Sequence, residues 1–192
     1  MTGAPGIIEH RADGRIAIAG GPQEPGSHEV SAGVDIQAER LIGPDVEAML
    51  LEAQEMLAGI YPPESRHGLD LGAYERPEVT LFVARDRGGA LGCCAFQLHQ
   101  DGSAEVKSMF VKPAARGRGL GRALLEAIEV ALRGRVGVLR LETGIEQAAA
   151  MRLYEAVGFR RRGPFGSYRD DPLSVFMEKP LPAAAPDPIA VD

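Results

Sequence analysis

The sequence predicts a mixed α/β fold of the α+β type, in which a central, mostly antiparallel sheet is flanked by helices. Three observations support this prediction. Residues 79–111 contain three strand-like segments separated by short turns, which is the pattern of an antiparallel meander. A glycine-rich turn then leads into an amphipathic helix over 122–133. After that helix, a strand at 136–142, a helix that carries Tyr154 and a strand at 174–179 complete the order.

Length and composition agree with one enzyme-sized domain. The chain has 192 residues, of which 45% are hydrophobic, and this is enough to bury a core without disulfides or metals. The formal net charge is −6 and there is no long run of Lys or Arg, which argues against nucleic-acid binding. We expect a cytoplasmic protein with no membrane partner, because no apolar run approaches the ~20 residues of a membrane span.

The two ends of the chain are expected to lie outside the domain. Residues 1–33 are rich in Gly and Pro and are interpreted as an N-terminal appendage, with a hairpin at 7–18 around an Asp-Gly turn. The domain is expected to span 34–181. Residues 182–192 contain several prolines and are expected to form a flexible tail.

The first strand of the domain is expected at 34–41, and a helix is expected to begin at Pro44, where proline fits the first helical position. Apolar residues recur along one face of this helix, at Val46, Met49, Leu50, Met56 and Leu57. Met49 and Met56 are interpreted as core residues rather than ligand contacts.

The meander that follows contains two adjacent cysteines. Cys93 and Cys94 fall in the strand at 90–98, where neighbouring side chains face opposite sides of the sheet. A disulfide between them is therefore not expected. No metal ion is implied, because no cluster of His, Cys and carboxylates has ligand spacing.

The segment from Glu105 to Gly121 organises the chain. Its apolar residues suit a strand, Pro113 ends that strand, and the glycines that follow permit a tight turn before the helix. The N–H groups of such a turn and the positive end of the helix dipole suit a pyrophosphate. Neither a Walker motif nor a Rossmann fingerprint fits, because Arg122 and Ala123 follow Gly121 and the third Rossmann glycine is missing.

Two motifs resemble those of a known superfamily. The pattern Arg-x-x-Gly-x-Gly at Arg116, Gly119 and Gly121 resembles the acetyl-coenzyme A (acetyl-CoA) loop of the GNAT superfamily of N-acetyltransferases. Residues 149–159 resemble the Leu-Tyr-Glu-x-x-Gly-Phe element of the same superfamily. The likeness covers about 34–181, and therefore implies the GNAT fold with acetyl-CoA as its co-substrate.

Parts of the chain further resemble a bacterial subgroup often labelled indoleacetate acetyltransferases. The resembling segments are 64–67, 141–144 and 164–177. The subgroup usually carries a longer connection before its Leu-Tyr pair, so we expect a different acceptor pocket here. By resemblance alone, the assembly would be a homodimer.

The resemblance places acetyl-CoA along the end of the strand, the glycine-rich loop and one amide side chain. Backbone N–H groups along 108–111 would hold the pantetheine arm and the acetyl carbonyl. Gln147 stands where the superfamily often has Asn. The expected cofactor-binding residues are Met109, Phe110, Val111, Arg116, Gly117, Arg118, Gly119, Leu120, Gly121, Arg122 and Gln147. A second basic cluster at 160–162 is either a solvated strand edge or a further phosphate contact.

The resemblance also implies the catalytic residues. Tyr154 takes the position of the general acid that protonates the departing thiolate, although a core Tyr or one that only hydrogen-bonds the sulfur fits the same pattern. Glu105 takes the position of the general base in some members. Its alternative is an exposed strand charge beside Lys107, and Glu142 at the end of the next strand is the second candidate for the base.

Tyr61, Arg66 and His67 are the expected acceptor-binding residues, because this segment borders the acceptor pocket in the superfamily. Arg66 can pair with a carboxylate through its guanidinium fork, and Tyr61 can form a wall. The alternative is a helix start capped by Ser65.

The sequence thus predicts transfer of acetyl from acetyl-CoA to a primary amine of a small molecule. Two alternatives stay open: acetylation of a protein or peptide amine, and a non-catalytic sensor of acyl-CoA.

Overall fold

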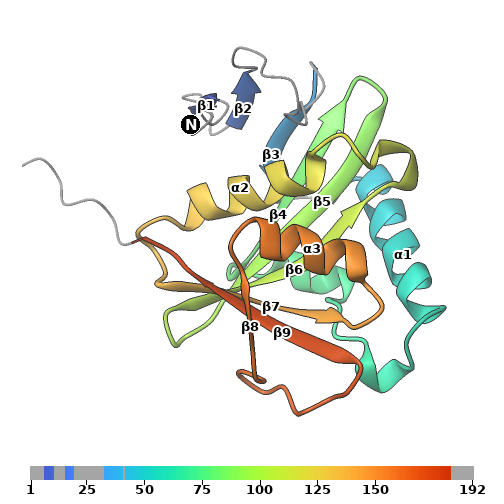
Figure 1. Cartoon of the computed structure of the whole chain (residues 1–192). Coiled ribbons are helices and arrows are strands. Elements are labelled where there is room, and N and C mark those ends of the chain that lie inside the picture. Colours follow the sequence, from blue (N-terminus) through green and yellow to red (C-terminus); the bar gives the residue numbers. More distant parts are fainter. Residues whose placement is uncertain (1–6, 11–15, 20–32, 41, 183–192) are drawn as a thin grey trace, which may run out of the picture.

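The computed structural model describes residues 7–10, 16–19, 33–40 and 42–182. One nine-stranded sheet forms the centre, in the order β1-β2-β3-β4-β5-β6-β7-β9-β8, with helices on both faces (Figure 1). The strands are β1 Ile7–His10, β2 Ile16–Ala19, β3 Asp35–Glu39, β4 Val79–Asp86, β5 Gly89–Leu98, β6 Ser103–Val111, β7 Val138–Gly144, β8 Arg160–Arg162 and β9 Ser174–Pro180. The helices are α1 Pro44–Ala58, α2 Leu120–Leu132 and α3 Ala148–Ala156, with 3-10 turns η1 Pro63–Ser65, η2 Leu71–Glu75 and η3 Pro113–Ala115.

The sheet is mixed and mostly antiparallel, as predicted. Strands β3, β4, β5 and β6 pair antiparallel in sequence order, which confirms the meander. Strand β6 then pairs parallel with β7. Strand β9 inserts antiparallel beside β7 and leaves β8 at the sheet edge.

The N-terminal strands extend the same sheet. Strands β1 and β2 pair antiparallel, as expected for the hairpin, and β2 meets β3 through Ile16 and Ile36. The turn of the hairpin and residues 183–192 lie outside the described residues. Among the helices that the structure describes, none is long and apolar enough to cross a membrane.

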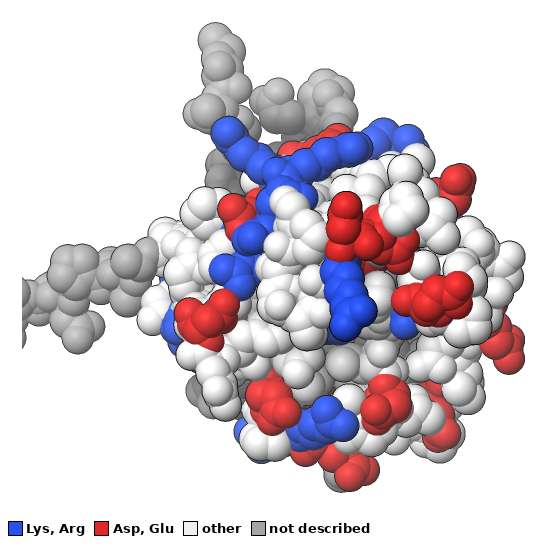
Figure 2. All heavy atoms as spheres, turned by 90° about the horizontal axis from the view of Figure 1, so that it is seen from below, with Lys and Arg blue, Asp and Glu red and all other residues white. Residues whose placement is uncertain are grey.

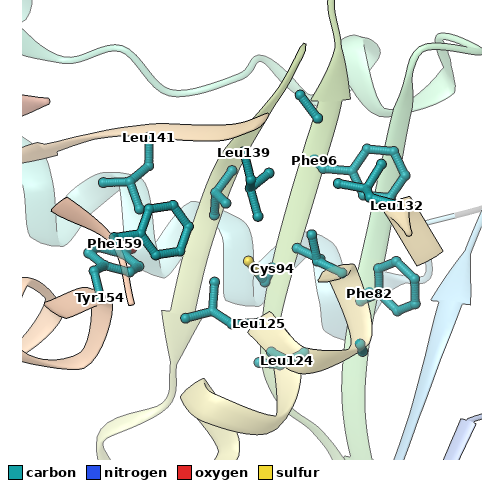
Figure 3. Packing of buried hydrophobic residues seen from close by; sticks show 14 of the residues in the cluster. Phe82, Cys94, Phe96, Leu124, Leu125, Leu132, Leu139, Leu141, Tyr154 and Phe159 are labelled. Carbon is teal, nitrogen blue, oxygen red and sulfur yellow. The ribbon is translucent and has the colours of Figure 1, made fainter. Parts of the chain in front are cut away.

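The larger core lies between the sheet and helices α2 and α3. The apolar face of α2, including Leu124, Leu125 and Leu132, packs against β4, β5 and β6 (Figure 3). A second core on the opposite face joins α1 and η2 to β4 and β5. Cys94 belongs to the first core and Cys93 to the second, and both are free thiols, so the alternation expected for this strand is confirmed.

Two expectations for individual elements were wrong. Strand β7 begins at Val138 rather than at residue 136, because the chain leaving α2 first makes a turn in which Val136 N donates to Leu132 O. Met56 is 36% exposed rather than in the core. The core residues of α1 lie in its N-terminal half, whereas Met56 lies over a cavity in the other half.

Candidate active site

Strands β6 and β7 separate where the predicted cofactor segment begins. Their parallel pairing ends at Val106 and Leu141, although β6 continues to Val111 and β7 to Gly144. Strand β7 stays paired with β9 along its full length. No described strand therefore pairs with the β7-facing edge of β6 beyond Val106, and its backbone groups are available to a ligand.

A cavity of about 150 Å³, called here the inner cavity, passes through this opening. On one side it is lined by Gln147, Ala150 and Tyr154 of the α3 region, and on the other by residues of α1. Residues 108–110 and 142–144 line it between these ends. The cavity thus joins the two faces of the sheet at one point.

A β-bulge shapes the wall of the inner cavity. The register between β5 and β6 shifts by one residue between the pairs Ala95/Lys107 and Cys93/Phe110. Ser108 lies in the bulge with φ 53°, a left-handed conformation that side chains other than glycine rarely adopt. Its hydroxyl is 2.5 Å from the hydroxyl of Tyr74 on η2, so a contact from another element holds the bulge.

The glycine-rich loop connects β6 to α2. Gly117 and Gly119 have φ values of 77° and 76°, which explains the glycines at these two positions. Gly119 directly precedes α2. The N–H groups in the first turn of a helix have no hydrogen-bond acceptor within the helix. An anion can therefore bind at this helix start.

The arginines of the loop have different surroundings. Arg116 Nε donates to Val111 O at 3.1 Å and so ties the loop to the end of β6. Arg118 lies 4.0 Å from the carboxylate of Asp86. Arg122 is exposed in the first turn of α2, where its charge is open to a ligand.

The second basic cluster lies on the edge strand β8. Arg161 is 3.7 Å from Glu155, and Arg162 pairs with Glu178 and lies over the ring of Phe165. These ion pairs agree with the strand-edge interpretation. Basic side chains also lie among acidic ones elsewhere on the surface: Figure 2 shows the two kinds interspersed on the face that it presents.

Tyr154 belongs both to the core and to the inner cavity. Its ring packs against Phe159 with the centroids 5.8 Å apart (Figure 3), and the residue is 5% exposed. Burial raises the pKa of Tyr154 well above its ordinary value of 10.0. The phenol therefore stays protonated and is available as a hydrogen-bond donor to a group in the cavity.

Glu142 lines the same cavity as Tyr154. One of its oxygens accepts a hydrogen bond from Ser174 Oγ at 2.6 Å. Burial raises the pKa of Glu142, and the negative charge of Glu105 adds to this, while the Ser174 hydrogen bond and the neighbouring His67 and Lys107 side chains oppose it.

Glu105 lines a different space, a neighbouring cavity of about 860 Å³ called here the outer cavity. Its carboxylate is buried and accepts hydrogen bonds from Tyr168 OH at 2.5 Å and Lys107 Nζ at 3.0 Å. His99 Nε2 lies 3.2 Å from its other oxygen. The structure therefore does not bring Glu105 together with Tyr154, whereas it does bring Glu142 there.

Lys107 separates the two cavities and was not predicted as a site residue. Its ammonium donates to His67 O and Tyr168 OH, both at 2.8 Å, as well as to Glu105. It thereby joins β6 to the segment after α1 and to the loop between β8 and β9. Its position two residues after Glu105 puts it on the same strand face, but nothing local in the sequence indicates Tyr168.

The three expected acceptor-side residues all line the inner cavity. Tyr61 packs over Gly144, and its hydroxyl accepts a hydrogen bond from Glu146 N at 2.9 Å. His67 makes an edge contact with Tyr168, and Arg66 is exposed at the cavity. Ser65 ends the turn η1 and caps no helix, so the capped-helix alternative does not describe this segment.

Comparison with known proteins agrees with this geometry. Residues 77–161 match the acetyltransferase (GNAT) domain family. The chain is 45% identical over 150 residues to an IAA acetyltransferase from Azospirillum brasilense, an alignment that covers 77% of this chain and 98% of that protein.

Solved structures show the same fold. A Klebsiella pneumoniae protein assigned as an acyl-CoA N-acyltransferase has a TM-score of 0.65 and 34% identity, covering 77% of this chain and 97% of that one. A Bacillus subtilis acetyltransferase crystallised with CoA has a TM-score of 0.55 and 16% identity, covering 76% and 97%. The chain therefore belongs to the GNAT acetyltransferase family, and it is an acetyl-CoA-dependent N-acetyltransferase.

Proposed function

We propose that this enzyme acetylates the primary amine of a small molecule in the inner cavity. One observation carries the proposal: Tyr154 and Glu142 line a single cavity that passes through the opening between β6 and β7. A thioester entering from the α3 side and an amine entering from the α1 side would meet there. The Azospirillum relative, named as an IAA acetyltransferase, supports a small-molecule acceptor.

Two parts of the chain would hold acetyl-CoA. The start of α2 and the loop before it, with Arg118 and Arg122, would bind the pyrophosphate through N–H groups and positive charge. The free edge of β6 along 108–111, with Gln147 opposite, would bind the pantetheine arm. A backbone N–H on that edge would stabilise the negative charge that develops on the carbonyl oxygen.

Glu142 is the base that the inner cavity supports best. It would take one proton from the acceptor ammonium, so that the free amine can form the new C–N bond while the C–S bond breaks. Tyr154 would donate its proton to the departing sulfur and be reprotonated by the second proton that the nitrogen loses as the amide forms; if Tyr154 gives only a hydrogen bond, that second proton passes to the thiolate itself. A carboxyl whose pKa lies above its ordinary value is better matched to proton transfer near neutral pH. Glu105 stays the other candidate.

The outer cavity favours a second candidate function. Its volume of about 860 Å³ would accommodate several residues of a peptide whose terminal amine reached the inner cavity. Acetylation of a protein or peptide amine therefore stays open as the alternative.

Thiol release from acetyl-CoA tests the proposal. We would measure it with a panel of small amines, amino acids and short peptides, and measure acetyl-CoA binding in parallel. Turnover with small amines or amino acids is the expected result. Turnover with peptides alone would favour the alternative, and tight binding without turnover on any acceptor would contradict the proposed reaction.

A further inference from the structure

We infer that the acceptor is a free amino acid with an apolar body, whose carboxylate binds Arg66 and whose amine lies at Glu142. The inference rests on the proposed function and specifies its acceptor. It is drawn from the lining of the inner cavity on the α1 side, where the acceptor would lie.

Most of that side of the cavity is apolar. Aliphatic side chains from α1 and from the segment after it form the surface, together with the aromatic rings of two tyrosines. The residues are Leu50, Ala53, Leu57, Tyr61, Leu69 and Tyr74. Such a wall favours an acceptor that carries hydrocarbon, because burying apolar surface contributes about 25 cal/mol per Å². It offers little to a strongly hydrated polyamine or sugar.

The polar groups on this side are few, and most are already engaged. Gln54 Nε2 donates to Leu69 O at 3.1 Å. The Lys107 ammonium donates to three acceptors, which accounts for all its protons. The side chain of Arg66, by contrast, makes no hydrogen bond or ion pair with any residue in the described part of the chain. Its guanidinium is therefore the cation of this cavity that is free to bind a carboxylate.

The charges of the cavity complement a zwitterion. Glu142 supplies a carboxylate for an incoming ammonium group, and Arg66 supplies a cation for a carboxylate on the same molecule. The N-terminus of a peptide has no carboxylate of its own beside the amine. An amino acid presents both charges and an apolar body, as the cavity requires.

Paired acceptors test the inference directly. We would measure kcat/KM with L-leucine, L-phenylalanine and 6-aminohexanoate, and with the amide of each, which keeps the amine and removes the negative charge. The wild-type enzyme is expected to prefer each acid over its amide by about tenfold or more, as a charge-assisted hydrogen bond provides.

Arg66→Gln should remove this preference by lowering kcat/KM for the acids about tenfold to a hundredfold while changing the amides less than about threefold. The matched control is Arg169→Gln, since Arg169 is an exposed arginine that lines the outer cavity alone. It should leave the preference unchanged.

Equal rates for acids and amides in the wild-type enzyme, or an equal loss for both in the Arg66 variant, would overturn the inference. Turnover of peptides or simple amines without turnover of any of these acids would overturn it as well, and would leave the proposed reaction standing. Absence of turnover with every acceptor would instead contradict the proposed function.

Discussion

At the scale of single residues, Ser108 stands out as the non-glycine residue with a positive φ in the described part of the chain. Its left-handed conformation costs about 1–2 kcal/mol for a residue with a Cβ atom, and the bulge and the contact with Tyr74 maintain it. The same bulge forms the wall of the inner cavity where β6 leaves β7. The strain is therefore located where the thioester would bind.

Two substitutions isolate this strain. Ser108→Gly and Ser108→Val both remove the hydroxyl that contacts Tyr74, but glycine accepts φ 53° and a β-branched residue does not. We expect the valine variant to be less stable than the glycine variant by about 1–3 kcal/mol in urea unfolding. Equal unfolding midpoints with equal slopes would show that the backbone at this position is not strained.

Sequence alone predicted the residues of local motifs better than residues whose role depends on distant contacts. Tyr154 and Gly119 lie within motifs of a few residues. In the structure, Tyr154 lines the inner cavity and Gly119 directly precedes α2. The bulge at Ser108 arises from the register between two strands, and the Lys107 contact with Tyr168 joins residues 61 positions apart. Neither leaves a local pattern in the sequence.

At the scale of elements, Tyr61 joins the segment after α1 to the end of β7. The ring lies so close to Gly144 that a Cβ atom there would be 2.2 Å from the ring, and Tyr61 itself is 5% exposed and cannot move aside freely. The absence of a side chain at Gly144 thus sets the position of one wall of the inner cavity.

Gly144→Ala is therefore expected to destabilise the protein by about 1–3 kcal/mol through overpacking. Gly137→Ala is the matched control, because a Cβ atom at Gly137, just before the same strand, would meet nothing within 4 Å. The control should stay within about 0.5 kcal/mol of the wild type. If thermal unfolding showed the two variants to be equally stable, the contact between Tyr61 and Gly144 would not constrain this end of β7.

Hydrophobic periodicity predicted most elements because it reports local burial. The five apolar residues of the helix after the loop are all buried, as their spacing indicates: Leu120, Leu124, Leu125, Ile128 and Leu132. Met56 shows the limit of this reasoning, since it lies seven residues after the buried Met49 and yet faces a cavity. Periodicity identifies a face of a helix but not how far the core extends beneath it.

At the scale of the whole molecule, the fold brings residues from distant segments to one opening in the sheet. The fold class and the family were predictable because two motifs occur in the right order over most of the chain. The division into an inner and an outer cavity could not be predicted from the sequence. It depends on where the pairing of β6 and β7 ends and on the hydrogen bonds by which Lys107 bridges two other segments. That division separates the two candidate bases.

The most direct test of this account is kcat/KM against pH for the wild type, Glu142→Gln and Glu105→Gln. We expect the wild-type rate to rise as Glu142 loses its proton, at a pH above 4.5 because burial raises its pKa. Glu142→Gln should lower the rate about 10²-fold or more. Glu105→Gln should stay active, with its acidic limb at lower pH, because removing the nearby negative charge lowers the pKa of Glu142. An inactive Glu105→Gln beside an active Glu142→Gln would contradict the account.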